Sequence, residues 1–252
     1  METWHFVAEK PGLLWSPEQI SGYLKTNHKP TVSHESIYQH IYAEQRAGGD
    51  LHRALRCQKQ RRKRYGSTER RGSIPNRVSI EQRPAIVDRR ERVGDWEADL
   101  VIGAGHQGAL LTLNERRSRL TLLAPLASKK ASVVADAMIS VLKPLAAHVH
   151  TITNDNGKEF AEHARIAKAL NAEIYFAHPY SSWERGANEN MNGLIRQFFP
   201  KNMGLKCIAK QAVQKAQKLL NHRPRKCLGF QTPFNVFSHA LQSEHCTVAL
   251  QA

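Results

Sequence analysis

Hydrophobic residues follow two patterns along this chain. Between residues 13 and 46 they recur at the three- and four-residue spacing of amphipathic helices. From about residue 93 they form short continuous runs, which are typical of buried strands, and these runs alternate with helical segments. The first pattern predicts a small helical unit, and the second predicts a larger domain built on a sheet.

The helical unit has clear start and stop signals. Ser16 is a good N-cap, with Pro17 in the first turn and Gln19 in position to close a capping box. Pro30 ends this helix, and Ser33 caps a second one. Two short helices with a tight connection predict a helix-turn-helix, a pattern that also occurs in helix pairs that do not bind DNA.

The second region predicts an α/β fold. Three apolar runs predict a three-stranded meander, and helix, strand, helix and strand follow it. The order βββαβαβ gives a mixed sheet flanked by helices, as in ribonuclease-H-like folds. The expected strands are 95–102, 109–113, 120–126, 149–153 and 172–176, and the expected helices are 128–144 and 158–170.

Charge adds a partner to this picture. The formal net charge is +15, and such a surface attracts polyanions, nucleic acid first among them. Residues 51–92 hold fourteen Lys and Arg against four acids. This segment is expected to be a basic linker or arm that is poorly ordered without its partner, although a solvated charged face is the alternative. Its densest cluster is Arg61, Arg62, Lys63 and Arg64.

Several classes are excluded by what the sequence lacks. No apolar run approaches 18 residues, and the first twenty residues have no continuous apolar stretch, so neither a membrane span nor a signal peptide is expected. The four cysteines lie far apart without a CxxC, which argues against disulfides and a zinc site. The expected compartment is the bacterial cytosol or nucleoid.

Three carboxylates lie where strands end or helices begin: Asp99, Asp155 and Glu189. Brought together, they make an oxygen-ligand site for Mg²⁺ or Mn²⁺, and two such ions promote phosphoryl transfer. Each has a structural alternative. Asp155 also fits a turn, and spacing alone does not choose among the rival acids. Those rivals are Asp95 and Glu97 for the first position and Glu184 for the third.

Six strings resemble the IS-thirty family of insertion-sequence transposases, which belongs to the superfamily of DDE transposases and retroviral integrases. They cover most of the chain from residue 13 to residue 237, and the stretch 175–201 is the most specific. The strings are WSPEQISGYL (15–24), VSHESIYQHIY (32–42), GDWEADLVIG (94–103), TITNDNGKEFAEH (151–163), YFAHPYSSWERGANENMNGLIRQFFPK (175–201) and LNHRPRKCLGFQTPFNVF (220–237).

The resemblance assigns the acids and the chemistry. Trp96-x-x-Asp99 resembles the family's first-strand motif, and Asp155 and Glu189, separated by thirty-three residues, match the second aspartate and the glutamate. It implies hydrolysis at the element's 3′ ends and attack of the freed 3′-OH on target DNA, with two Mg²⁺ or Mn²⁺ ions per active site. The implied partners are the terminal inverted repeats, the target DNA and further copies of the chain, since two DNA ends must be joined.

Other residues are candidate DNA contacts. Arg196 lies two helical turns after Glu189 and would contact a phosphate, unless it is a plain surface arginine. A loop before the catalytic helix would stack on splayed bases, although its aromatic side chains fit an inward packing equally well. A second basic stretch, at 223–226, is either a DNA contact or a solvated turn. The loop residues are Tyr180, Trp183 and Arg185, and the second stretch holds Arg223, Arg225 and Lys226.

The predicted organisation has four parts: a helix-turn-helix unit at 1–50, a basic linker at 51–92, a catalytic core at 93–237 and a tail at 238–252. Family members usually carry more sequence upstream, so the resemblance implies a short member or a truncated start. Two other functions fit the same features. One is a non-catalytic DNA-binding regulator derived from a transposase, and the other is a different ribonuclease-H-like nuclease.

Overall fold

The computed structural model describes residues 6–249 apart from 8, 11, 56–73, 179–183 and 185, and the side chains of 186–189 and 244–249 also lie outside the description. The chain divides into two compact units. One joins Met1–Ser67 with Asn221–His239, and the other joins Thr68–Leu220 with Ala240–Ala252.

The first unit is built on two helices, α2 (Pro17–Thr26) and α3 (His34–Arg46). The predicted capping box is present, because Gln19 N–H donates to Ser16 Oγ and Ser16 N–H donates to Gln19 Oε1. The two helices share a buried apolar cluster with Trp15. The expected helix pair is therefore confirmed, and its central buried residues are Ile20, Leu24, Ile37 and Ile41.

The second unit is built on a six-stranded sheet with the order β1-β6-β5-β2-β3-β4. Strands β2, β3 and β4 form the predicted antiparallel meander, and β5, β6 and β1 run parallel to β2. This order confirms the α/β, ribonuclease-H-like fold class. The strands are β1 (Val78–Ser79), β2 (Asp95–Ile102), β3 (Ala109–Glu115), β4 (Thr121–Leu126), β5 (Thr151–Asn154) and β6 (Glu173–Phe176).

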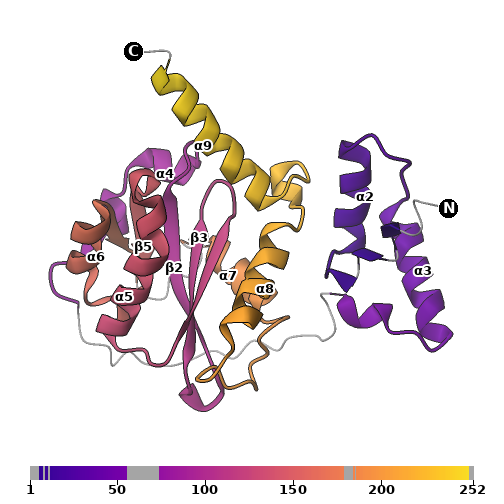
Figure 1. The fold of residues 1–252 in the computed structure, drawn as a ribbon, viewed down its shortest axis with the longest axis horizontal. Helices are drawn as coiled ribbons and strands as arrows, with labels where there is room; N and C mark the ends of the chain where they lie inside the picture. The colour runs from indigo at the N-terminus through magenta and orange to yellow at the C-terminus, as the bar shows by residue number, and fades with distance from the viewer. Residues whose placement is uncertain are drawn as a thin grey trace. The chain divides into compact units, whose positions relative to one another are not determined.

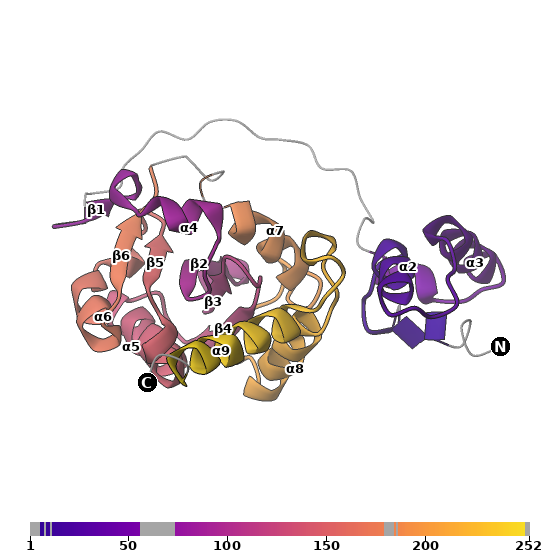
Figure 2. The same ribbon diagram turned by 90° about the horizontal axis from the view of Figure 1, so that it is seen from above.

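Helices cover both faces of this sheet (Figures 1 and 2). Helices α5 (Ala131–Leu142) and α6 (His163–Leu170) lie on one side, and α4 (Ala85–Arg89) and α7 (Gly186–Ile195) lie on the other. By length and composition alone, the helical stretch 131–148 could cross a membrane. Its residues Val134, Met138 and Leu142 are buried against the sheet and α6, as expected for a core helix.

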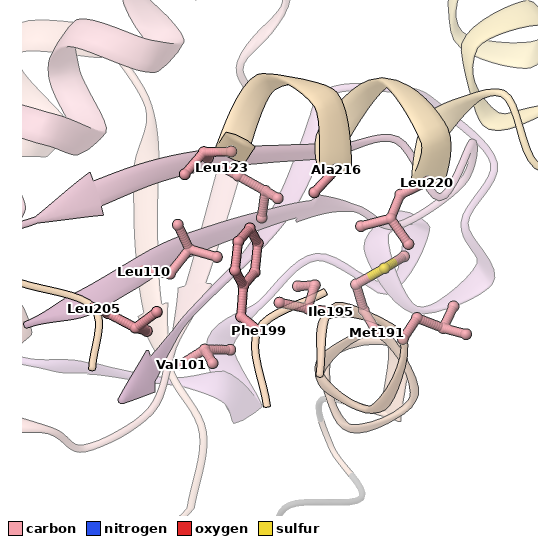
Figure 3. Close-up of a cluster of buried hydrophobic side chains, with 11 residues drawn as sticks. Val101, Leu110, Leu123, Met191, Ile195, Phe199, Leu205, Ala216 and Leu220 are labelled. Carbon is pink, nitrogen blue, oxygen red and sulfur yellow. The ribbon is translucent and has the colours of Figure 1, made fainter. Parts of the chain in front are cut away.

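An apolar cluster fixes α7 and the following helix, α8 (Lys210–Asn221), to the sheet (Figure 3). Phe199 lies at its centre, below α8 and beside α7. The strands contribute Val101, Leu110 and Leu123, α7 contributes Met191, Leu194 and Ile195, and α8 contributes Val213, Ala216 and Leu220. Helices α7 and α8 therefore share one closely packed core with the sheet.

Two predicted boundaries differ from the structure. Residues 74–92 were expected to belong to a poorly ordered linker, but they fold onto the sheet domain, where β1 pairs with β6 and Val87 is fully buried. The physical reason is that tertiary contacts anchor the segment, among them β1, the buried Val87 and the hydrogen bond from Arg83 to Thr153 Oγ1, and such short elements leave no periodic signal. The described part of the predicted linker also includes η1 (Leu51–Ala54), η2 (Ile80–Gln82) and α4.

Residues 221–237 were expected in the catalytic core, but they belong to the unit of α2 and α3. Gln19 Nε2 donates to the Pro224 carbonyl over 2.8 Å, and Gly22 on α2 faces the Phe230 ring. These long-range contacts depend on the tertiary fold, which the local pattern does not encode. The segment contains η7 (Lys226–Leu228) and the start of α9 (Pro233–Ala249).

Candidate active site

Strand β2 presents three carboxylates on one face, and the structure separates their roles. Asp95 is 1% exposed and is paired with Arg92, with 3.0 Å between Oδ2 and Nε. Glu97 is also 1% exposed and pairs with the buried Arg116. Each of these two buried carboxylates therefore has an arginine as its counter-charge, as buried charges require. Asp99, the third, is only partly buried.

Asp155 lies directly beyond β5, the strand that pairs with β2. Their parallel register sets Asp95 beside Thr151 and Glu97 beside Thr153. Extending this register by two residues sets Asp99 beside Asp155, and neighbouring strands are about 4.8 Å apart. The turn reading of Asp155 also holds, because its Oδ1 accepts the Gly157 N–H over 2.9 Å. A turn and a cation site are compatible at this position, because an ionised carboxylate has two oxygens that together offer about four acceptor sites.

Helix α7 docks on the first aspartate through an amide. Asn192 Nδ2 donates to Asp99 Oδ2 over 2.7 Å. Residue 189 lies in α7 three positions before Asn192, and positions three apart share a helix face. The Glu189 side chain lies outside the described residues. Among the side chains that are described, no group of three His, Cys, Asp or Glu residues could hold a metal ion.

Glu184, the rival to Glu189, has a different partner. Its carboxylate accepts the backbone N–H of His178 over 2.8 Å and contacts the His178 ring Nδ1 at 2.7 Å. This hydrogen bond, together with the nearby Glu81, raises the pKa of His178 above its ordinary value. The contact ties the end of β6 to the start of α7. His178 and Glu184 line a cavity of about 400 Å³ together with Ile80, Glu81, Arg83, Asp88, Arg90 and Arg116.

Arg196 points back to the backbone. Its guanidinium donates to the Ile102 carbonyl over 2.8 Å and to the Phe199 carbonyl over 3.3 Å, and burial lowers its pKa. These contacts tie the end of α7 to the end of β2. A phosphate contact by Arg196 remains a prediction. The other candidates in the preceding loop, Tyr180, Trp183 and Arg185, lie outside the described residues.

The basic stretch at 223–226 was expected to be either a DNA contact or a solvated turn, and the structure does not show a solvated turn. Arg223 is 2% exposed and Arg225 is 8% exposed, so their side chains lie inside their unit. Lys226 is exposed and pairs with Glu18 at 2.6 Å. A DNA contact by this stretch stays a prediction, with Lys226 best placed for it. The cluster Arg61, Arg62, Lys63 and Arg64 lies outside the described residues.

Two contacts of the site were not predicted from the sequence: that of Asn192 with Asp99 and that of Glu97 with Arg116. Asn192 is one amide among several in its helix, and no local pattern marks it as the one that contacts Asp99. The pairing of Glu97 with Arg116 had a signal, because polar residues at 95, 97 and 99 alternate along an otherwise apolar strand. Three acids on one buried face require compensating cations.

The sheet order and the docking of α7 on Asp99 define a ribonuclease-H-like protein with its polar site at the end of β5. No family model matches the sequence. The chain is 44% identical over 236 residues to the transposase for insertion sequence element IS4351 of Bacteroides fragilis, covering 93% of this chain and 72% of that one.

A second transposase and one solved structure are also similar to this chain. Transposase InsI for insertion sequence element IS30A of Escherichia coli K12 is 36% identical over 250 residues, which cover 93% of this chain and 64% of that protein. The solved catalytic core domain of BIV integrase is similar to 62% of this chain and covers 98% of that structure, with a TM-score of 0.48 and 22% identity. The chain belongs to the IS-thirty family of insertion-sequence transposases.

Proposed function

We propose that Asp99, Asp155 and Glu189 form the catalytic centre of this transposase and hold two Mg²⁺ or Mn²⁺ ions. The observation that supports the proposal is the pairing of β2 with β5, whose register of Glu97 with Thr153 leads toward Asp99 and Asp155, together with the docking of α7 on Asp99. Helix α7 also carries residue 189. Three segments far apart in the sequence thus contribute one acid each.

The residues fit such ions. Carboxylate oxygens are the ligands that hard divalent cations prefer. Asn192 Oδ1 is buried and has no hydrogen-bond partner among the described residues, so it can accept a hydrogen bond from an ion's water. When bound, two such ions activate the attacking oxygen and stabilise the leaving oxygen of a phosphodiester. Asp99, Asp155 and Glu189 would hold the ions.

The proposed site carries out two reactions on DNA, strand cleavage and strand joining. Water attacks a phosphodiester at the element's 3′ end, the P–O bond breaks, and a free 3′-OH remains. This 3′-OH then attacks a phosphodiester of the target, the target's own P–O3′ bond breaks, and the target strand is left with a free 3′-OH while its 5′ phosphate is joined to the element's end. No covalent bond to the protein forms, since no nucleophilic side chain is required. Two ends must be joined, so we propose that the chain acts as a dimer or larger assembly in the bacterial cytosol.

The test is cleavage and joining on a terminal-repeat duplex with Mg²⁺. Asp99→Asn, Asp155→Asn and Glu189→Gln should each lose at least about a hundredfold in both steps, because stabilisation worth several kcal/mol is removed. Asp136→Asn is the matched control, because that aspartate is exposed on α5 and pairs with Arg165. Full activity of Asp155→Asn would contradict the assignment.

The same assay separates the two other functions. A regulator derived from a transposase would bind the repeats without cutting them in any divalent metal. A different ribonuclease-H-like nuclease would cut branched or hybrid substrates and join nothing. Joining by the wild-type chain excludes both.

A further inference from the structure

The sequence around α8 has an unusual charge distribution. Residues 190–243 hold nine Lys and Arg and no Asp or Glu. Ordinary surface helices mix both signs, since oppositely charged side chains four residues apart stabilise them. Helix α8 has no such pair, and Lys210 lies at its N-terminal end, where the helix dipole disfavours a positive charge. A local cost of this kind indicates a functional requirement.

The lysines of α8 share one face. At 100° per residue, positions 210, 211, 214, 215 and 218 fall within an arc of about 140°. All five side chains are exposed, and they are Lys210, Gln211, Gln214, Lys215 and Lys218. The opposite side of α8 is apolar and packs into the cluster around Phe199 (Figure 3). Lysines and glutamines without an acid form a surface that suits a row of phosphates.

The position of this face suits a DNA contact. Val213, Ala216 and Leu220 of α8 and Met191 and Ile195 of α7 belong to one buried cluster. A duplex held on the lysine face is therefore held at a fixed place relative to the helix that carries residue 189. Lysine contacts to phosphate give orientation and affinity without reading the base sequence.

We propose that the face formed by Lys210, Lys215 and Lys218 binds the phosphate backbone of the DNA on which this transposase acts. The inference rests on DNA being the substrate of the proposed function, but not on the identity of the catalytic acids. It adds a phosphate-binding surface to the catalytic unit, made of other residues than the basic cluster at 61–64 and the stretch at 223–226.

The test is the salt dependence of binding, measured with the full chain and no divalent cation. Each lysine–phosphate contact contributes about 0.9 to the slope of log K against log salt. The triple variant Lys210→Gln, Lys215→Gln, Lys218→Gln should therefore lower the slope by about 2 to 3. The loss should be equal on a terminal-repeat duplex and an unrelated duplex. The triple Lys→Arg variant should keep the wild-type slope.

A second triple variant controls for net charge. Lys130, Lys143 and Lys168 are exposed beside or on α5 and α6, which cover the opposite side of the sheet. Their change to Gln removes the same charge and should leave the slope within about 0.5 of wild type. Equal slopes for the two Gln triples, or a loss confined to one DNA sequence, would overturn the proposal. Failure of the catalytic assignment would instead appear as cleavage by Asp155→Asn, with these slopes unaffected.

Discussion

One amide connects the helix of the third proposed acid to the strand of the first. Asn192 donates to Asp99, and its own oxygen is buried without a partner among the described residues. A side chain that orients a metal-binding carboxylate affects activity by about 10- to 100-fold when it is removed. Asn192 is therefore a positioning residue of the proposed site.

We predict that Asn192→Ala lowers strand cleavage by about 10- to 100-fold. The Mg²⁺ concentration for half-maximal activity should rise as well, a change that loss of packing alone would not produce. Asn190→Ala is the control, because the Asn190 side chain is exposed on the same helix. An unchanged Mg²⁺ requirement in Asn192→Ala would contradict this role.

The contact between His178 and Glu184 predicts a pH dependence. The pKa of His178 is raised above its ordinary value of 6.5 by the hydrogen bond with Glu184. A raised pKa in the folded state means that the contact is fully formed below pH 6.5 and weakens as pH rises through the folded-state pKa. Loss of the proton removes the charge attraction between the His178 ring and Glu184, while the hydrogen bond from the His178 backbone N–H to Glu184 remains.

An NMR titration of the His178 ring checks this prediction. The midpoint should lie above 6.5 in the wild type and fall toward 6.5 in Glu184→Gln. A wild-type midpoint at or below 6.5 would show that the carboxylate does not hold the ring in solution.

At the scale of single residues, the sequence identified the types of group but not every partner. The acids at 99, 155 and 189 stand out because carboxylates interrupt apolar strands or begin a helix, and the family resemblance then selected them. The rivals Asp95, Glu97 and Glu184 have partners at 92, 116 and 178 in the structure. Only Arg92 is close to its acid in the sequence, so local spacing could not have separated the rivals from the proposed ligands.

Among the elements, β2 shows how an ionic network supports the sheet beside the site. Arg116 pairs with Glu97 and lies 3.6 Å from Asp88, while Arg83 pairs with Asp88 and donates to Thr153 Oγ1 over 2.9 Å. These groups connect α4 to the face of the sheet next to Asp99. Removal of Arg116 leaves Glu97 buried without its counter-charge.

We predict that Arg116→Met lowers the free energy of unfolding by about 3 to 5 kcal/mol, because Glu97 then remains charged in the interior. Arg117→Met should change stability by less than about 0.5 kcal/mol, because that side chain is exposed. Chemical denaturation followed by circular dichroism measures both. The double variant Glu97→Gln, Arg116→Met should recover part of the lost stability. Equal free energies of unfolding for Arg116→Met and Arg117→Met would contradict the network's role.

Capped helices and apolar strands could be predicted from the sequence, because local residues mark them. Short elements could not be predicted, because tertiary contacts hold them in place. Ser16 and Ser33 mark the starts of α2 and α3, and the runs around Leu100, Leu111 and Leu123 mark the meander. Strand β1 has two residues and depends on β6 for its hydrogen bonds. Its pairing brings the end of the predicted basic linker into the sheet.

At the scale of the whole molecule, segments from both ends of the chain build one unit. Gly22 lies on α2, and a Cβ atom added there would come within 2.3 Å of the Phe230 ring. Alanine in a helix is normally about 1 kcal/mol more favourable than glycine. Close packing against residue 230 reverses that preference here, which explains a glycine inside a helix.

We predict that Gly22→Ala lowers the free energy of unfolding by about 1 to 3 kcal/mol through overpacking. Combined with Phe230→Ala, the same change should become neutral or favourable, since the ring is gone. A double-mutant cycle by thermal unfolding gives the coupling between the two positions. Additive effects would show that α2 and the 221–239 segment do not pack together in solution.

Metal-directed cleavage of the protein backbone tests the convergence of the three acids most directly. Fe²⁺ replaces Mg²⁺, ascorbate and peroxide generate radicals at the bound ion, and mass spectrometry locates the cuts. The wild-type chain should be cut near residues 99, 155 and 189 together, and Asp155→Asn should lose all three sets of cuts while Asp136→Asn keeps them. Cuts at other positions, or undiminished cuts in Asp155→Asn, would contradict a shared cation site.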